Sequence, residues 1–122
     1  MQLNNSEWEI MNILWNNSDL DLDLKEIRLA VSKAGIDWSP NTTQTLLVRL
    51  ERKGAVSVQK GTNHFRYSAN ISRENCEKEA MNHLLAKVFR GSAKKLLMSF
   101  ADSGNLSEEE IESIQKVIDK MH

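Results

Sequence analysis

The amino-acid sequence predicts a mostly α, α+β fold, and three patterns along its 122 residues support this prediction. Helical periodicity, interrupted by capping and turn residues, runs through residues 6–53. Two alternating segments then flank a turn between residues 55 and 68, as in a β-hairpin. Helical periodicity returns from residue 72 onward. Helices followed by a hairpin are typical of a winged helix-turn-helix domain, which we place at residues 1–70, with a separate helical domain at residues 71–122.

Two capping patterns predict the first two helices. Ser6 and Glu9 have the S-x-x-E spacing in which each side chain satisfies a backbone N–H at the helix start. Asp23 and Glu26 repeat this arrangement. Residues 20–22 alternate between the two helices and predict a short strand. Apolar residues at helical spacing should face inward: Trp8, Met11, Leu14 and Trp15 in the first helix, and Leu24, Ile27, Val31 and Ala34 in the second.

The next segment, WSPNTTQTLLVRLERK at residues 38–53, predicts a helix with defined ends. Ser39 suits the N-cap and Pro40 the first helical position, where its missing N–H costs nothing. Gly54 can adopt the left-handed conformation that follows a helix. One face of the helix should be buried: Thr43, Leu46, Leu47 and Leu50. Together with the preceding helix and its short connection, this helix completes a helix-turn-helix.

The opposite face of this helix carries the side chains of a DNA recognition helix. Asn and Gln can read base edges, Thr and Val can touch a thymine methyl, and Arg can hold phosphate. We therefore predict that Asn41, Thr42, Gln44, Thr45 and Val48 read bases, and that Arg49 and Arg52 contact phosphates. An ordinary amphipathic surface helix would show the same periodicity, so the neighbouring segments have to decide between the two interpretations.

After Gly54 the hydrophobic period changes to two, which predicts a β-hairpin from residues 55–60 and 64–68. Its inner face should consist of Val56, Val58, Phe65 and Tyr67. Lys60 and Arg66, near the exposed tip, are further candidates for phosphate contacts. The alternative is a hairpin that only covers the core. A basic hairpin directly after a recognition helix is better explained as a wing that touches the DNA backbone.

The net charge of −1 conceals a positive zone in the middle of the chain. Residues 1–37 carry three basic and seven acidic side chains, whereas residues 38–70 carry five basic side chains and one acidic one. A balance of +4 on the proposed recognition helix and wing indicates a polyanionic partner. The alternative function is a winged-helix module that binds another protein, and such a module would not need this concentration of positive charge.

Serines at three positions predict three further helices in residues 72–122. Ser72, Ser92 and Ser107 are N-cap candidates, and Ser107 forms a capping box with Glu110. About fifty residues are too few to bury all the apolar faces of these helices against one another. We therefore expect a homodimer interface at Leu84, Leu85, Val88, Ile111, Ile114 and Ile118. The alternative is an intramolecular three-helix unit.

Several classes of protein are excluded by what the sequence lacks. The single cysteine, Cys76, rules out an internal disulfide framework and fits a reducing compartment. No run of about 18 apolar residues predicts a membrane span, and the first residues do not form a secretory signal. No catalytic, metal-binding or phosphate-binding motif is present. We expect a cytoplasmic protein that is not an enzyme and that uses no metal or cofactor.

Four segments of the chain resemble those of a known family. They are SEWEIMNILW at residues 6–15, WSPNTTQTLLVRLERKGAV at 38–56, FRYSANIS at 65–72 and KVFRGSAKKLLMSFADSGNLSEEEIESI at 87–114. They span nearly the whole chain, which resembles the penicillinase and methicillin-resistance repressors (BlaI/MecI type) of the bacterial winged-helix regulators. The resemblance implies a homodimer whose N-terminal winged helices read a palindromic operator, with half-sites of TACA/TGTA type, and whose C-terminal helices dimerise.

The resemblance also implies two ways of relieving repression. In one branch of the family, a membrane-bound sensor pathway triggered by β-lactam leads to cleavage of an Asn–Phe bond. The matching bond here is Ser99–Phe100, which keeps the Phe and has Ser in place of Asn. In the other branch, copper-responsive repressors carry C-x-C motifs near the C-terminus, and this chain has no cysteine there. The sequence leaves the inducing signal open.

Overall fold

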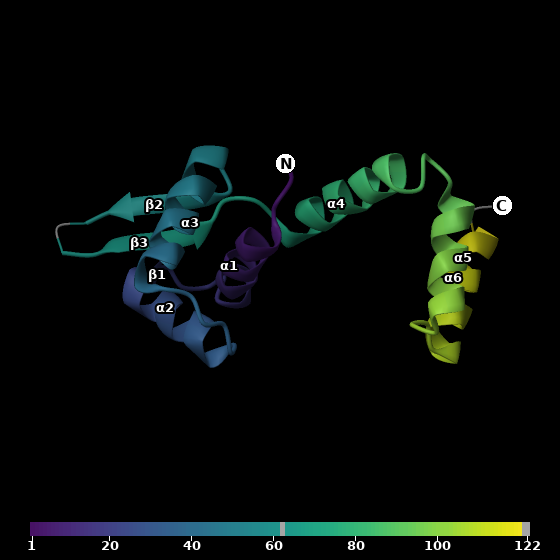
Figure 1. The fold of residues 1–122 in the computed structure, drawn as a ribbon, viewed down its shortest axis with the longest axis horizontal. Coiled ribbons are helices and arrows are strands. Elements are labelled where there is room, and N and C mark those ends of the chain that lie inside the picture. Colours follow the sequence, from purple (N-terminus) through teal and green to yellow (C-terminus); the bar gives the residue numbers. More distant parts are fainter. Residues whose placement is uncertain (62, 121–122) are drawn as a thin grey trace. The chain divides into compact units, whose positions relative to one another are not determined.

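The computed structural model describes residues 1–61 and 63–120, and the chain divides into two compact units at the boundary between Ala80 and Met81. The first unit contains three helices, a small sheet and the start of a fourth helix (Figure 1). The elements are, in chain order, α1 (Asn5–Asn16), β1 (Leu22–Asp23), α2 (Leu24–Lys33), α3 (Pro40–Lys53), β2 (Val56–Lys60), β3 (Phe65–Ala69), α4 (Arg73–Lys87), α5 (Ala93–Ser103) and α6 (Glu108–Lys120). This order confirms the predicted winged helix-turn-helix followed by helices.

The sheet of the first unit is antiparallel, with the strand order β1-β3-β2. Tyr67 in β3 lies opposite Val58 in β2 and opposite Leu22 in β1, so the three side chains share one face. The predicted hairpin is therefore confirmed. The short strand predicted at residues 20–22 forms slightly later, at Leu22–Asp23.

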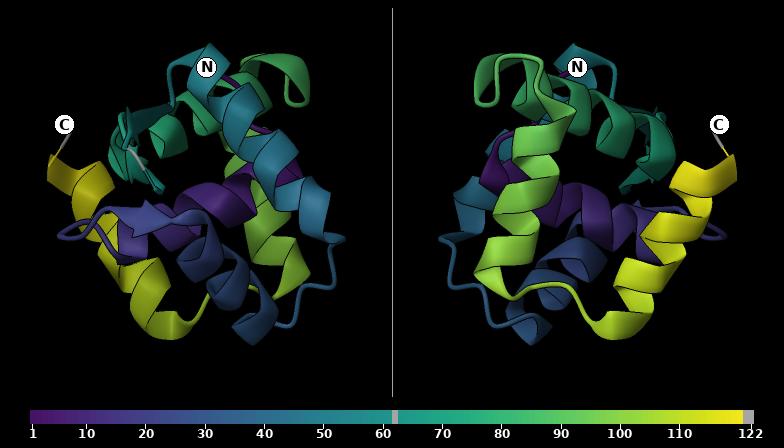
Figure 2. Two further views of the ribbon diagram at one scale, coloured as in Figure 1. Left: turned by 90° about the vertical axis from the view of Figure 1, so that its left-hand side faces the viewer. Right: turned by 90° about the vertical axis from the view of Figure 1, so that its right-hand side faces the viewer.

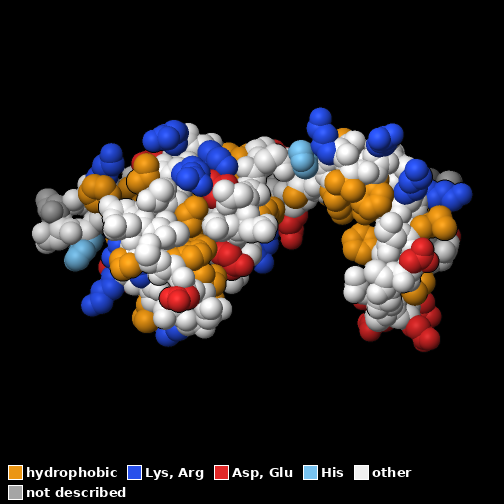
Figure 3. Space-filling model, viewed as in Figure 1, with side chains coloured by type: hydrophobic (Ala, Val, Ile, Leu, Met, Phe, Trp, Pro, Cys, Tyr) orange, Lys and Arg blue, Asp and Glu red, His pale blue; other side chains and the backbone are white. Residues whose placement is uncertain are grey.

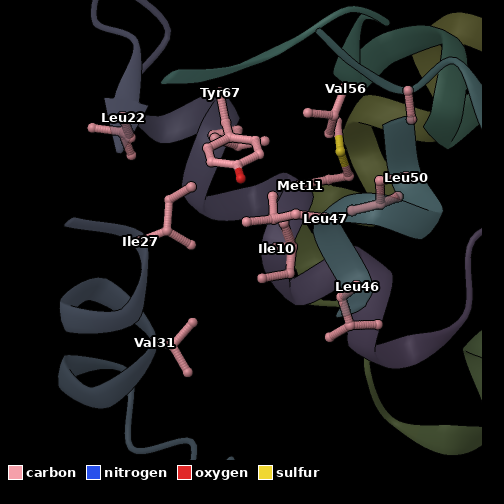
Figure 4. Packing of buried hydrophobic residues seen from close by; sticks show 12 residues of the cluster. Ile10, Met11, Leu22, Ile27, Val31, Leu46, Leu47, Leu50, Val56 and Tyr67 are labelled. Atoms are coloured by element: carbon pink, nitrogen blue, oxygen red, sulfur yellow. The ribbon is translucent and has the colours of Figure 1, made fainter. Parts of the chain in front are cut away.

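The hydrophobic core of the first unit is formed by side chains from α1, α2, α3 and all three strands (Figure 4). Met11 of α1 and Leu47 of α3 are completely buried, as predicted, and so are Ile10 of α1 and Ile27 of α2. Full burial of each such side chain stabilises the fold by about 1.5–3 kcal/mol relative to exposure. The core fixes α2 and α3 against α1, and so determines which face of α3 points to solvent.

The start of α1 differs from the prediction. The N-cap is Asn4 and its capping partner is Glu7, not the predicted pair of Ser6 and Glu9. The Oδ1 atom of Asn4 accepts from the N–H of Glu7 at 2.8 Å, and Oε1 of Glu7 accepts from the N–H of Asn4 at 2.9 Å. The helix begins earlier because Glu7 is buried against the fold, whereas Glu9 faces solvent. The capping boxes predicted at Asp23–Glu26 and Ser107–Glu110 are confirmed.

The tip of the hairpin extends beyond the core. Phe65 shares a sheet face with the buried Tyr67, as predicted, but 46% of its surface is exposed. Its cross-strand neighbour is Lys60, the last residue of β2, which is also exposed. The prediction that Phe65 belongs to the buried inner face is therefore wrong, because this end of the two strands extends beyond the helices that cover the rest of the sheet.

In the second unit, α5 and α6 leave the loop between them at an angle (Figure 2). The N-cap predicted for α5 is confirmed, since the Ser92 hydroxyl accepts from the N–H of Lys95, and Ser72 caps the start of α4 in the first unit in the same way. Leu96 of α5 is buried, whereas α6 buries none of its described side chains. Apolar side chains that remain largely exposed include Val88, Leu97, Met98, Ile111 and Val117. The described chain by itself leaves these apolar faces uncovered.

Candidate nucleic-acid interface

The ends of α3 form as the sequence predicts. Ser39 has the extended conformation of an N-cap, Pro40 occupies the first helical position, and Gly54 follows the helix with φ +86°. The Ser39 hydroxyl, however, does not cap a backbone N–H; it pairs with the Thr42 hydroxyl at 2.8 Å. The predicted buried face, which includes Thr43 and Leu50, is confirmed. The polar face of α3 therefore points to solvent.

A shallow hollow runs along this exposed face. Its lining consists of Asn41, Gln44, Thr45, Val48, Arg49 and Arg52, with no acidic side chain. Six of the seven residues on α3 that were predicted to read bases or hold phosphates therefore lie on one surface. Thr42 is half-buried and lies in an adjoining hollow with Ser6 of α1. Figure 3 shows Lys and Arg side chains gathered over the part of the first unit that contains α3.

The side chains of this face differ in what they can offer a base. The Oγ1 atom of Thr45 donates to the carbonyl of Asn41 at 2.9 Å, so its hydroxyl proton is already used. Thr45 can then present its methyl group or accept a hydrogen bond. Gln44 is exposed and keeps both a donor and an acceptor. Val48 is also exposed and can contact a thymine methyl.

The four candidate phosphate contacts are not equally available. Within the described part of the chain, the structure gives Arg49, Arg52 and Lys60 no hydrogen bond or ion pair from their side chains, and all three are exposed. Arg66, in contrast, donates through Nη2 to the carbonyl of Asp21, and the same atom lies 3.9 Å from Oε1 of Glu26. The Arg66 side chain is therefore already engaged with residues beside the sheet and at the start of α2, and it is less available to a phosphate than the other three.

The wing and α3 share a second hollow. Gln44 from α3, Lys25 from α2, and His64 and Phe65 from the wing are among its lining residues. Because Gln44 lines both hollows, the polar face of α3 and the wing form one continuous surface. This surface includes residues of both the helix and the wing, so an extended partner could contact both elements at once.

Arg28 is a residue of the site that the sequence analysis missed. Its Nε and Nη2 atoms both donate to the carbonyl of Pro40, at 3.1 and 2.7 Å. This fork from α2 holds the first turn of α3 in place. No local pattern in the sequence indicates such a contact, because Arg28 precedes Pro40 by twelve residues and lies on another helix.

The other end of α3 is held by an ion pair between the buried Glu7 and the partly exposed Lys53. Lys53 donates to Oε1 of Glu7 at 2.7 Å and to the carbonyl of Gln2 at 3.1 Å. Burial by itself would raise the pKa of Glu7, but the Asn4 N–H, the Lys53 ammonium and the Arg49 charge together hold this pKa below its ordinary value. Lys53 therefore contributes to the fold, although it counts toward the positive charge of the segment.

The predicted dimer residues lie on α4 and α6, apart from Val88, which directly follows α4. Leu84 and Val88 line an apolar groove with Phe89, Leu96 and Phe100. Leu85, Ile114 and Ile118 are half-buried, and Ile111 is exposed. The Ser99–Phe100 bond lies within α5, with both residues exposed. Across residues 1–61 and 63–120, no helix has the length and apolar character to cross a membrane, and no three His, Cys, Asp or Glu residues cluster as metal ligands do.

The family to which the chain belongs is shown by its relatives. The model of the penicillinase repressor family matches residues 3–120. The methicillin resistance regulatory protein MecI of Staphylococcus aureus (strain N315) is 28% identical over 121 residues, which cover 98% of this chain and 94% of that protein. The penicillinase repressor of Bacillus licheniformis is 29% identical over 119 residues, or 98% of this chain and 91% of that protein.

A solved structure agrees with this assignment. It is the Bacillus licheniformis BlaI monomeric form in complex with the blaP half-operator, and it matches this fold with a TM-score of 0.52. The match is 35% identical in sequence and covers 62% of this chain and 88% of the other. The chain is thus a member of the penicillinase repressor family, whose proteins are DNA-binding transcriptional repressors and not enzymes.

Proposed function

We propose that this repressor binds a palindromic operator as a homodimer, with α3 of each protomer in the major groove of one half-site. The observation that carries the proposal is the exposed face of α3, where amide, hydroxyl and methyl groups lie beside two arginines in one hollow without an acidic side chain. Asn41, Gln44 and Thr45 occupy the first turns of the helix, the part that enters the groove in helix-turn-helix proteins. They read base edges, and Val48 adds an apolar contact.

The positive residues supply affinity that does not depend on sequence. Arg49 and Arg52 lie toward the back of α3 and hold phosphates, while Lys60 on the wing holds the backbone beside the groove. The complex of the Bacillus licheniformis BlaI monomeric form with a half-operator supports this arrangement, since that protein shares the fold. Because bacterial DNA lies in the cytoplasm, the protein acts there.

Dimerisation is assigned to the helices that follow the winged helix. The apolar groove at Leu84, Val88 and Phe100, and the apolar side chains of α6, are left open by the described chain. Covering them with a second copy removes this apolar surface from water, which is favourable by about 25 cal/mol per Å². A dimer then presents two winged helices, as a palindrome requires.

Relief of repression is assigned to cleavage at Ser99–Phe100 within α5, downstream of a membrane sensor. A cut there removes the second half of the C-terminal unit and leaves the α3 face intact. A chain that ends at Ser99 should then bind one half-site with unchanged base preference but bind two half-sites without cooperativity. If that truncated chain binds the full operator as tightly as the intact chain, repression is not controlled at this bond.

The proposed function is tested by selecting bound sequences from random double-stranded DNA with the purified chain. We expect an inverted repeat whose half-sites are about one helical turn apart or a multiple of it. A selection without enrichment, or with enrichment of a single unrepeated site, would contradict the proposal.

A further inference from the structure

The start of α4 belongs to the DNA-binding unit. This unit extends to Ala80, although α4 is one helix that continues to Lys87. Sequence patterns alone suggest a boundary just before α4, at residues 70 and 71. The structure instead joins the first turns of α4 to α1 and to the N-terminus through several contacts.

The first set of contacts surrounds Trp15 of α1. Its indole N–H donates to the carbonyl of Ile71, two residues before α4 begins, at 2.9 Å. The guanidinium of Arg73 lies over the Trp15 ring, 5.4 Å from its centroid, and donates to Oδ1 of Asn16 at 2.8 Å. Trp8 packs edge-on against Trp15 with the ring centroids 5.7 Å apart. We call Trp8, Trp15, Asn16, Ile71 and Arg73 the α1–α4 joint.

A second set of contacts continues the attachment along α4. The Cys76 side chain is only 3% exposed, one turn after Arg73. The Glu79 carboxylate pairs with the N-terminal ammonium of Met1, and its backbone carbonyl accepts from Nε2 of Gln2 at 3.5 Å. The attachment therefore covers about two turns of the helix.

We propose that Trp15 and Arg73 are positioning residues that fix the direction in which α4 leaves the DNA-binding unit, and thereby set the half-site spacing that the dimer accepts. The inference rests on the proposed function, because a spacing exists only for a dimer on two half-sites. A flexible linker before α4 would let each winged helix find its half-site over a range of separations, whereas a helix held at its start does not.

The geometry of a helix makes this effect large. A helix of 15 residues is about 22 Å long at 1.5 Å per residue. A tilt of about 10° at its start moves its far end by about 4 Å, which exceeds the distance of roughly 3.4 Å between base pairs. Loosening the joint should therefore widen the range of half-site separations that the dimer accepts by at least one base pair. The residues that face DNA would not change.

The test uses the full chain and two kinds of DNA, a single selected half-site and pairs of half-sites with spacers changed by one to about five base pairs, half a helical turn. The double variant Trp15→Phe/Arg73→Ala removes the indole donor and the guanidinium. Lys78→Ala is the matched control, since Lys78 is an exposed residue of the same helix. Cys76, the single cysteine of the chain, reports opening of the joint through its rate of reaction with a thiol reagent.

We expect the double variant to expose Cys76 faster, to bind a single half-site within about twofold of the wild type, and to lose roughly tenfold of its discrimination between spacers. The Lys78→Ala control should match the wild type in all three measurements. An unchanged Cys76 rate, unchanged spacer discrimination, or an equal loss of half-site binding would each overturn the inference. Failure of the wild-type chain to bind the single half-site would instead refute the proposed function.

Discussion

Among single residues, the ion pair between Lys53 and Glu7 gives the clearest prediction for stability. The Glu7 carboxylate is completely buried, and its Oε2 atom has no hydrogen-bond partner among the described residues. Replacing Lys53 with Met leaves this charge without its counter-ion, so we expect a loss of about 1–3 kcal/mol in the free energy of unfolding. Urea denaturation at pH 7 measures it. Arg52→Met, at an exposed neighbour, should stay within about 0.5 kcal/mol of the wild type.

The same pair predicts how stability depends on pH. The pKa of Glu7 is lower in the folded chain than its ordinary value of 4.5. Its ionised form therefore stabilises the fold above that value, and this contribution is lost as the pH falls through the lower, folded pKa. The difference in unfolding free energy between the wild type and Glu7→Gln should shrink as the pH is lowered below about 4.5. A difference that stays constant down to pH 3 would show that the Glu7 charge does not stabilise the fold.

Among the individual elements, α3 is expected to determine which bases the protein prefers. Gln44 lies in the first turns, exposed and with a donor and an acceptor both available. Gln44→Ala should relax the preference at one base position by roughly 1–3 kcal/mol if the contact is bidentate. Repeating the selection from random DNA with this variant measures the change. An unchanged motif for the double variant Gln44→Ala/Thr45→Ala would contradict the assignment of α3 as the reading element.

The wing predicts a difference between its two basic residues. Lys60 is exposed at the end of β2, whereas Arg66 is already bonded to the carbonyl of Asp21. Lys60→Ala should weaken binding to all sequences alike and reduce the slope of log affinity against log salt by about 0.9. Arg66→Ala should change that slope less. A loss confined to one operator sequence would show that the wing reads bases.

Features of these elements that depend on neighbouring residues could be predicted from the sequence, whereas features that depend on distant residues could not. The ends of α3 were predictable because Pro40 and Gly54 determine them through their own backbone preferences. The start of α1 was misplaced because two capping pairs overlap, and burial of Glu7 decides between them. The contacts that hold α3 were not predictable, since Arg28 reaches Pro40 across 12 residues and Lys53 reaches Glu7 across 46. Such contacts follow from tertiary packing, which periodicity does not reveal.

At the scale of the whole molecule, the account depends on two protomers acting together. A single winged helix contacts one half-site, and the second half-site adds affinity only when it is tethered to the first. Val88 offers a clean test of this dependence because it lines the apolar groove and is 62% exposed. A charge at this position should hardly disturb the isolated protomer, while it should oppose burial of the groove against a second copy.

The most direct measurement is therefore sedimentation velocity of the Val88→Glu variant during titration with an operator duplex. The wild type should bind two protomers per duplex, and Val88→Glu should sediment as a folded monomer with operator affinity lower by about 100-fold. Asn82→Glu, which places the same charge at an exposed position of α4 six residues before Val88, should behave as the wild type. If Val88→Glu still binds as two protomers with full affinity, or if the wild type binds as one, the C-terminal helices do not assemble this repressor on DNA.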